Sequence, residues 1–178
     1  MFYRLISTAV VAAMTLSALA FVPPAQADSS DSRNLKNVMD KTGIPYKLIE
    51  GHAAMKYAIP NSNGRSQYVL VKSEPHSLIP SGSKQAKTFR IITSPIRSGQ
   101  FEPLSLAVKQ QLLQDSNVRI IGNWQNVRAE DGTDDALVFV AKVDTDLSPQ
   151  DLAQAIQWTA TAADAMEQKL FDQDNGNP

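Results

Sequence analysis

The sequence predicts an α+β domain in which helices pack on an antiparallel sheet of five to six strands, in the order α-β-β-β-β-α-β-β-α. Segments in which apolar and polar residues alternate follow one another with short turns between them. This favours antiparallel pairing, because parallel strands need long crossover connections. Helical periodicity is found before, between and after these segments. Together these observations predict two layers, with helices covering a sheet.

The first half of the chain supplies one helix and four strands. The helix is expected over Ser32–Thr42, because Leu35, Val38 and Met39 lie at helical spacing and Gly43 follows as a C-terminal cap. Four alternating segments predict strands, and the turn residues Asn61–Gly64 separate the second strand from the third: Tyr46–Glu50, Met55–Ile59, Tyr68–Val71 and Phe89–Ile92. The polar segment Glu74–Ala86 contains two prolines and is expected to form a long exposed loop.

The second half supplies a helix, two strands and a closing helix. Pro103 is expected at the first position of the middle helix, which ends near Asp115-Ser116-Asn117. Its apolar stripe would be Leu104, Ala107, Val108, Gln111 and Leu112. The strands are expected over Val118–Gln125 and Ala136–Val143.

The closing helix is the clearest element in the sequence. Ser148 is a suitable N-cap, Pro149 takes the first helical position and Asp151 follows three residues after the cap. One stripe then repeats at intervals of three and four residues over about five turns: Leu152, Ile156, Thr159, Ala163, Met166 and Leu170.

The N-terminal residues 1–27 predict a cleavable export signal. Arg4 precedes an uncharged run, Leu5–Val22, and Ala25-Gln26-Ala27 supplies the small residues of a signal-peptidase site. We therefore expect cleavage between Ala27 and Asp28, and a periplasmic or secreted protein. The alternative is an uncleaved anchor, since roughly 18 apolar residues can span a bilayer. Residues 28–172 would then form a single domain, and 173–178 a disordered tail.

Composition excludes several classes of function. Losing Arg4 leaves 16 of the 17 basic residues against 18 acidic ones, a net charge of −2, which argues against a nucleic-acid partner and against a basic membrane-binding patch. The chain contains no cysteine, which excludes disulfides, a lipid-modified cysteine, thiolate zinc sites and cysteine nucleophiles. We expect no stable membrane anchor after signal cleavage.

No catalytic or metal-binding motif stands out, so we expect a protein that is not an enzyme and has no cofactor. His52 and His76 are the only histidines and are interpreted as strand-end or surface residues rather than metal ligands. Glu130, Asp131, Asp134 and Asp135 crowd one hairpin tip, but they lack EF-hand spacing and favour a solvated loop. The sequence contains no Gly-x-Ser-x-Gly elbow and no glycine-rich phosphate loop.

The residues of the second half carry a family resemblance. Leu112-Leu113-Gln114-Asp115-Ser116-Asn117 precedes Ile121-Gly122-Asn123-Trp124; then come Leu137-Val138-Phe139-Val140-Ala141, Ser148-Pro149 and a helix with Ala163-Asp164. This pattern and the order of elements over Asp31–Leu170 resemble the YbjN-like proteins and the type III secretion chaperones that share their fold. The resemblance implies a protein that binds other proteins rather than one that catalyses a reaction, and it supplies no catalytic residues.

The closing helix also predicts a candidate interface. Trp158 falls about 120° from the centre of the main stripe and shares its side with Ala155, Ala162 and Ala165, so the helix would carry a second apolar face for another protein or a second copy of the chain. The competing interpretation is a single wide stripe with Trp158 at its edge.

We expect an exported protein-binding or regulatory, chaperone-like module, with the Glu74–Ala86 loop as a second contact. The alternative function is an envelope small-molecule-binding protein or hydrolase with a cleft between sheet and helices. Trp124 is expected in the core or against the first helix.

Overall fold

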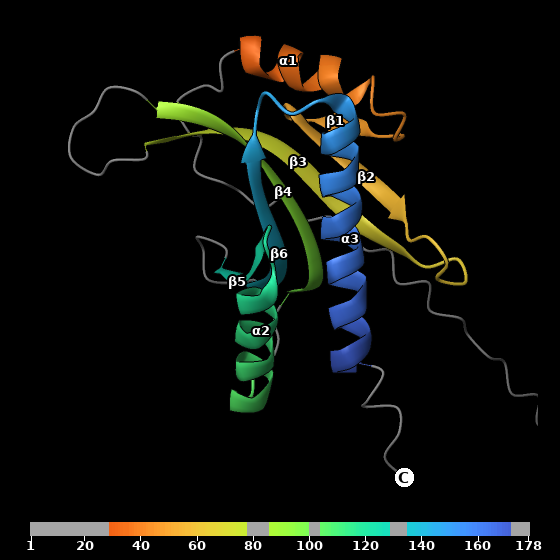
Figure 1. Cartoon of the computed structure of the whole chain (residues 1–178), viewed down its shortest axis with the longest axis vertical. Helices are drawn as coiled ribbons and strands as arrows, with labels where there is room; N and C mark the ends of the chain where they lie inside the picture. The colour runs from red at the N-terminus through yellow and green to blue at the C-terminus, as the bar shows by residue number, and fades with distance from the viewer. Residues whose placement is uncertain (1–28, 78–85, 100–103, 129–134, 172–178) are drawn as a thin grey trace, which may run out of the picture.

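Three helices and one six-stranded sheet make up the part of the chain that the structure describes. The computed structural model describes residues 29–77, 86–99, 104–128 and 135–171 (Figure 1). The predicted signal segment 1–27 and tail 173–178 lie outside these ranges. The elements are α1 (Ser29–Met39), β1 (Lys47–Ile49), β2 (His52–Ala58), β3 (Ser66–Ser77), β4 (Ala86–Gly99), α2 (Leu106–Val118), β5 (Asn123–Arg128), β6 (Asp135–Asp144) and α3 (Pro149–Phe171).

All neighbouring strands of the sheet pair antiparallel, in the order β1-β2-β3-β4-β6-β5. This arrangement confirms the predicted fold class and the predicted order of helices and strands. The swap of β5 and β6 at one edge follows from α2, which leaves the sheet after β4 and returns the chain to the outer position. Two edges result, and the short β1 and the six-residue β5 occupy them.

Helices α1, α2 and α3 pack on the same face of the sheet, as Figure 1 shows for α3. Leu35 of α1 and Ile156 of α3 share one core cluster with Ala53 and Val71 of the strands. Leu112 of α2 belongs to a second cluster, which also holds residues of α3 and β6. A third cluster contains only strand residues and lies on the opposite side of the sheet: Ile91, Ala136, Val138 and Val140, with Phe89 and Val127 packed against them. The sheet is therefore a two-sided layer, and each described helix lies on one side of it.

A tight turn and a longer connection join the first three strands and fix their register. Glu50 and Gly51 both have positive φ between β1 and β2, the geometry that matches the twist of a two-residue hairpin. Asn61, Asn63 and Gly64 have positive φ between β2 and β3, where the sequence predicts a turn. Asparagine and glycine adopt positive φ at low energetic cost.

The sequence-based strand limits need correction at several places. β3 and β4 are much longer than predicted and pair as far as Ser77 and Ala86. The two ends of the predicted Glu74–Ala86 loop, Glu74–Ser77 and Ala86, are therefore strand, and residues 78–85 lie outside the described part. The predicted Val118–Gln125 strand is also misplaced. α2 continues to Val118, and β5 begins only at Asn123.

α2 begins later than predicted. Ser105 is its N-cap and its side chain accepts a hydrogen bond from the Val108 amide. Pro103, predicted at the first helical position, lies outside the described residues.

α3 forms as predicted. Its N-cap Ser148 accepts a hydrogen bond from the Asp151 amide at 3.1 Å, and the Ser148 hydroxyl donates to the Asp151 carboxylate at 2.7 Å. The predicted stripe from Leu152 to Met166 is buried. Among the residues that the structure describes, no helix is long and apolar enough to cross a membrane.

Candidate interaction surface

Trp158 is the one member of the predicted α3 interface that is largely exposed. Its side chain is 52% exposed, whereas Ala155 and Ala162 are only 4% and 3% exposed, and Ala165 is half-buried. Ala155 and Ala162 belong to the two helix-side core clusters, because the sheet wraps a wide strip of α3. The prediction of a separate exposed face on α3 is therefore wrong for these two alanines. Trp158 stands at the edge of one wide apolar stripe.

Several large aliphatic side chains are exposed on α2 and in the residues that follow it, and together they are called the α2 surface. Leu106, Leu113, Val118 and Ile120 range from 63% exposed for Leu113 to complete exposure for Ile120. Leu106 and Leu113 are seven residues apart and therefore project from the same side of the helix. Within α2 only Leu112 is buried. The helix thus carries its aliphatic side chains mainly away from the fold.

Sequence reasoning missed this surface because it assigned one stripe to α2 and left the remaining leucines unexplained. Of the predicted stripe, Leu112 is buried, Leu104 and Val108 pack against the second core cluster, and Ala107 is exposed. The available signal was the Leu112-Leu113 pair. Adjacent residues on a helix point about 100° apart, so Leu106 and Leu113 lie about 100° from Leu112. They therefore fall at the edge of a stripe that is centred on Leu112.

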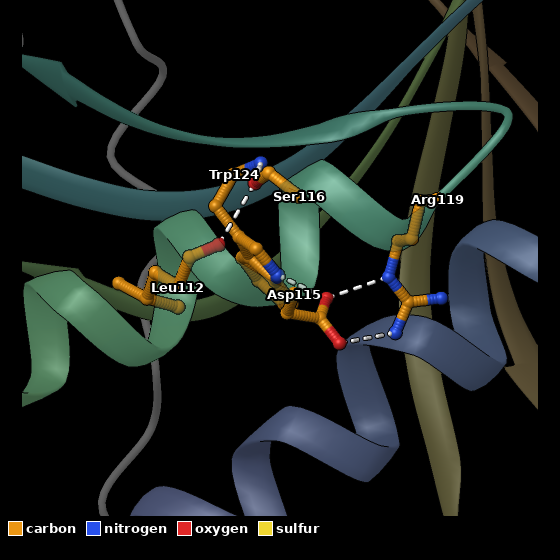
Figure 2. A network of polar contacts seen from close by, with 5 residues as sticks. All are labelled: Leu112, Asp115, Ser116, Arg119 and Trp124. Atoms are coloured by element: carbon orange, nitrogen blue, oxygen red, sulfur yellow. Dashed lines mark hydrogen bonds and ion pairs between the residues drawn. The ribbon is translucent and has the colours of Figure 1, made fainter.

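A polar network holds α2 in place against β5 (Figure 2). Arg119 donates to Asp115 through Nε at 2.6 Å and through Nη2 at 2.9 Å, which is a bidentate ion pair. Trp124 Nε1 donates to the same Asp115 carboxylate at 2.7 Å. One carboxylate therefore joins the end of α2, the segment that follows it and the beginning of β5.

Ser116 makes a second link between the same elements. Its hydroxyl donates to the Leu112 carbonyl at 2.9 Å and accepts from the Trp124 amide at 3.1 Å (Figure 2). The hydroxyl thus closes the last turn of α2 and satisfies a backbone donor at the outer edge of β5. A serine in the last turn of a helix can serve both purposes because its side chain is short and is donor and acceptor at once.

Aromatic packing completes the attachment of α2 to the sheet. The Trp124 ring meets Phe139 of β6 edge to face, with centroids 5.1 Å apart, and the Arg119 guanidinium lies 5.1 Å from the Phe139 centroid. Gly122 has φ +85°, and a Cβ at this position would lie 2.5 Å from the Phe139 ring. Trp124 therefore belongs to the core, as one prediction held, but it packs against α2 and not against the first helix.

The electrostatics favour an ionised Asp115. Burial raises the pKa of its carboxyl, but the hydrogen bonds from Arg119 and Trp124 favour the charged form more strongly, so the pKa lies below the ordinary value. Lys169 of α3 lowers the pKa further through its charge. The ion pair is consequently present throughout the neutral range.

Two polar contacts attach α3 to the beginning of β3. Arg65, which precedes β3, donates from Nη2 to the buried Asp164 carboxylate at 2.8 Å. Gln67 donates to Glu167 one turn further along α3. Asp164 is the acidic member of the Ala163-Asp164 pair, and in this fold the pair is structural: the alanine packs in the core and the aspartate binds the β2–β3 hairpin.

The remaining predicted chemical groups do not come together in the described residues. His52 begins β2 as predicted, and burial and the charge of Lys72 lower its pKa. His76 lies near the end of β3, and the acidic tip residues 130–134 fall outside the described part. Within the described residues, no three histidine or carboxylate side chains are grouped as metal ligands. No known protein-family model matches the chain, and no curated protein matches it significantly.

Proposed function

We propose that this chain is an exported, non-enzymatic protein-binding module of the chaperone-like type that its residue pattern resembles. The observation that carries the proposal is the pair of exposed leucines, Leu106 and Leu113, on one side of α2. Val118 at the end of α2 and Ile120 beyond it are exposed as well. Monomeric soluble proteins rarely leave several large aliphatic side chains exposed together, and such surfaces are typical of protein contacts. Trp158, half-exposed on α3, adds a residue type that is enriched at binding hot spots.

The exposed side chains of α2 are held on a rigid support, which favours the binding of a partner. The Asp115 network and the Phe139 contacts attach the C-terminal end of α2 to the sheet. A preorganised apolar surface loses less conformational entropy when a partner covers it. The proposed partner is another protein, which would bury the α2 side chains inside a polar rim.

The alternative function, a cleft between sheet and helices, receives less support. In the described residues the side chains between α3 and the sheet are core residues: Ala160 and Ile156 of α3 and Val71 and Ile92 of the strands are buried against one another. A ligand between these layers would have to displace packed aliphatic groups, which cores resist because they are close-packed.

Crosslinked affinity capture of the tagged protein from living cells tests the proposal. We expect a stoichiometric partner that is lost in Leu113→Ser and weakened in Trp158→Ser, with both variants folded because both side chains are largely exposed. Lys41→Ser, an exposed position that follows α1, serves as the control and should retain the partner. Recovery of the protein alone, at a size no larger than a dimer, would contradict a role in binding another protein.

A further inference from the structure

The face of the sheet opposite α3 carries an ordered arrangement of apolar and basic residues that the sequence did not reveal. One row of directly paired residues crosses all six strands on this face. The row is Lys47, Ala54, Leu70, Thr93, Val140 and Asn123. Its middle four members form a mainly apolar strip that spans about 14 Å at the usual strand spacing. Ala54, Leu70 and Thr93 of this strip are partly exposed, whereas Val140 is buried in the third core cluster.

The direction of these side chains follows from the alternation along each strand. Ala53, Val71, Ile92 and Ala141 are members of the core cluster that holds α1 and α3 residues. Because successive strand residues point to opposite faces, the neighbouring residues of the row point away from the helices. The strip is therefore separate from the α2 surface and lies on the other side of the molecule.

Lysines flank this strip on both sides. A flanking row lies two residues away from Ala54 and Leu70 and contains Lys56 of β2, which is paired with Tyr68 of β3. A second flanking row lies two residues away from Thr93 on the other side of the strip. In this row Ile91 of β4 is paired with Lys72 of β3 and Lys142 of β6. Lys56 and Lys142 are exposed, and Tyr68 is 62% exposed. Each flanking row lies about 7 Å from the strip.

Positive charge is concentrated in these three rows in spite of the net negative charge of the chain. The next row on this face contains Glu74 and Asp144, which form ion pairs with Lys72 and Lys87. None of the described strand residues in these three rows carries a carboxylate. Their charged side chains are Lys47, Lys56, Lys72 and Lys142. Lys72 forms an ion pair with Glu74, which belongs to the next row along β3. Lys47, Lys56 and Lys142 thus form an exposed basic perimeter around the apolar strip, hereafter the basic sheet face.

We propose that the basic sheet face binds an acidic segment of another polypeptide chain. Aliphatic side chains of that segment would lie on Ala54, Leu70 and Thr93, the partly exposed members of the strip, and its carboxylates on Lys47, Lys56 and Lys142. Charge complementarity selects the acidic partner. The apolar strip selects a polypeptide over a nucleic acid, because single-stranded nucleic acids are bound on several stacked aromatic rings. Tyr68 is the only large aromatic side chain exposed among the described residues of these rows.

Binding of a labelled random copolymer of glutamate and alanine to the purified protein tests this proposal. We expect binding that weakens with added salt and falls about tenfold or more in the triple variant Lys47→Gln/Lys56→Gln/Lys142→Gln. The matched control Lys41→Gln/Lys109→Gln/Lys169→Gln removes the same charge from exposed lysines on the helix side and should bind as the unmodified protein does. Tyr68→Ser should weaken binding by a smaller factor. Thermal unfolding would verify that each variant is folded.

Three outcomes would overturn the proposal. The first is equal loss of binding in the two triple variants, which would mean that only net charge matters. The second is equal binding of polyglutamate, which has no aliphatic side chains for the strip. The third is lysine-dependent binding of phosphatidylglycerol vesicles or a DNA oligonucleotide in preference to the copolymer. Leu113→Ser should leave copolymer binding unchanged. The basic sheet face can therefore fail this test while the α2 surface still binds its partner, and the α2 surface can fail its own test while the basic sheet face binds the copolymer.

Discussion

Helices α2 and α3 lie on the same side of the sheet but are held there by different means. α3 has a capped start, a continuous stripe from Leu152 to Met166 that is buried, and the Asp164 contact to the β2–β3 hairpin. α2 has one buried side chain, Leu112, and depends on the Asp115 network at its C-terminal end. The comparison indicates that α3 organises the core, whereas α2 is positioned by polar contacts and presents apolar side chains outward.

The largest expected effect is in α3. Ile156 is fully buried against both α1 and the sheet. Ile156→Ala should lower the free energy of unfolding by about 4 kcal/mol, because it removes buried methylene groups and leaves a cavity. Urea denaturation measures this loss, and the exposed neighbour substitution Gln157→Ala should change stability by less than about 0.5 kcal/mol. Equal effects at the two positions would show that α3 does not form the core.

Adjacent leucines in α2 sharpen the comparison within one helix. Leu112→Ala should cost about 3 kcal/mol because its side chain packs against α3 and β6. Leu113→Ala should change stability by less than about 0.5 kcal/mol because Leu113 is largely exposed, while partner capture should weaken. Similar destabilisation by both substitutions in urea titrations would mean that Leu113 is covered within the monomer, and the α2 surface would then be lost as an interface.

Glycine substitutions test the contact between the α2–β5 connection and the sheet. Gly122→Ala should destabilise the protein by about 3 kcal/mol, because it combines a positive φ with a Cβ 2.5 Å from the Phe139 ring. Gly64→Ala is the control: its φ is also positive, at +87°, but no atom lies within 4 Å of the added Cβ. This change should cost about 1 kcal/mol. Equal shifts in thermal unfolding would mean that the Phe139 contact is not tight.

The Asp115 ion pair gives a smaller and pH-dependent effect. Asp115→Asn should lower stability by about 1–2 kcal/mol at pH 7, because the charge-assisted bonds from Arg119 and Trp124 are weakened. The pKa of Asp115 is lower in the folded state than in the unfolded chain, so its contribution is present above the unfolded-state pKa and is lost as the pH falls through the folded-state value.

The difference between the two proteins should therefore shrink as the pH falls below about 4, near the ordinary carboxyl pKa. Denaturant titrations at pH 7 and at successively lower pH values measure this convergence. A constant difference across the series would show that Asp115 contributes through packing rather than through its charge.

The sequence by itself determined the fold class, the order of elements and the whole of α3. Periodicity sufficed for α3 because its stripe, its cap and its first-turn proline agree over 23 residues. Strand limits were less accessible. β3 runs through Glu74, Pro75 and His76, a polar segment with a proline, because pairing with β4 stabilises residues whose own preferences favour a loop.

Only the tertiary structure decided which surfaces remain outside. Periodicity shows which residues share a face of a helix but not how much of that face the sheet covers. Ala155 and Ala162 are therefore buried although an exposed face was predicted for them, and the exposure of Leu113 was not predicted. The basic sheet face depends on register across strands that are far apart in the chain, such as Thr93 with Val140. The pairing of strands that are distant in the chain is decided when all elements pack together, and it cannot be read from either strand by itself.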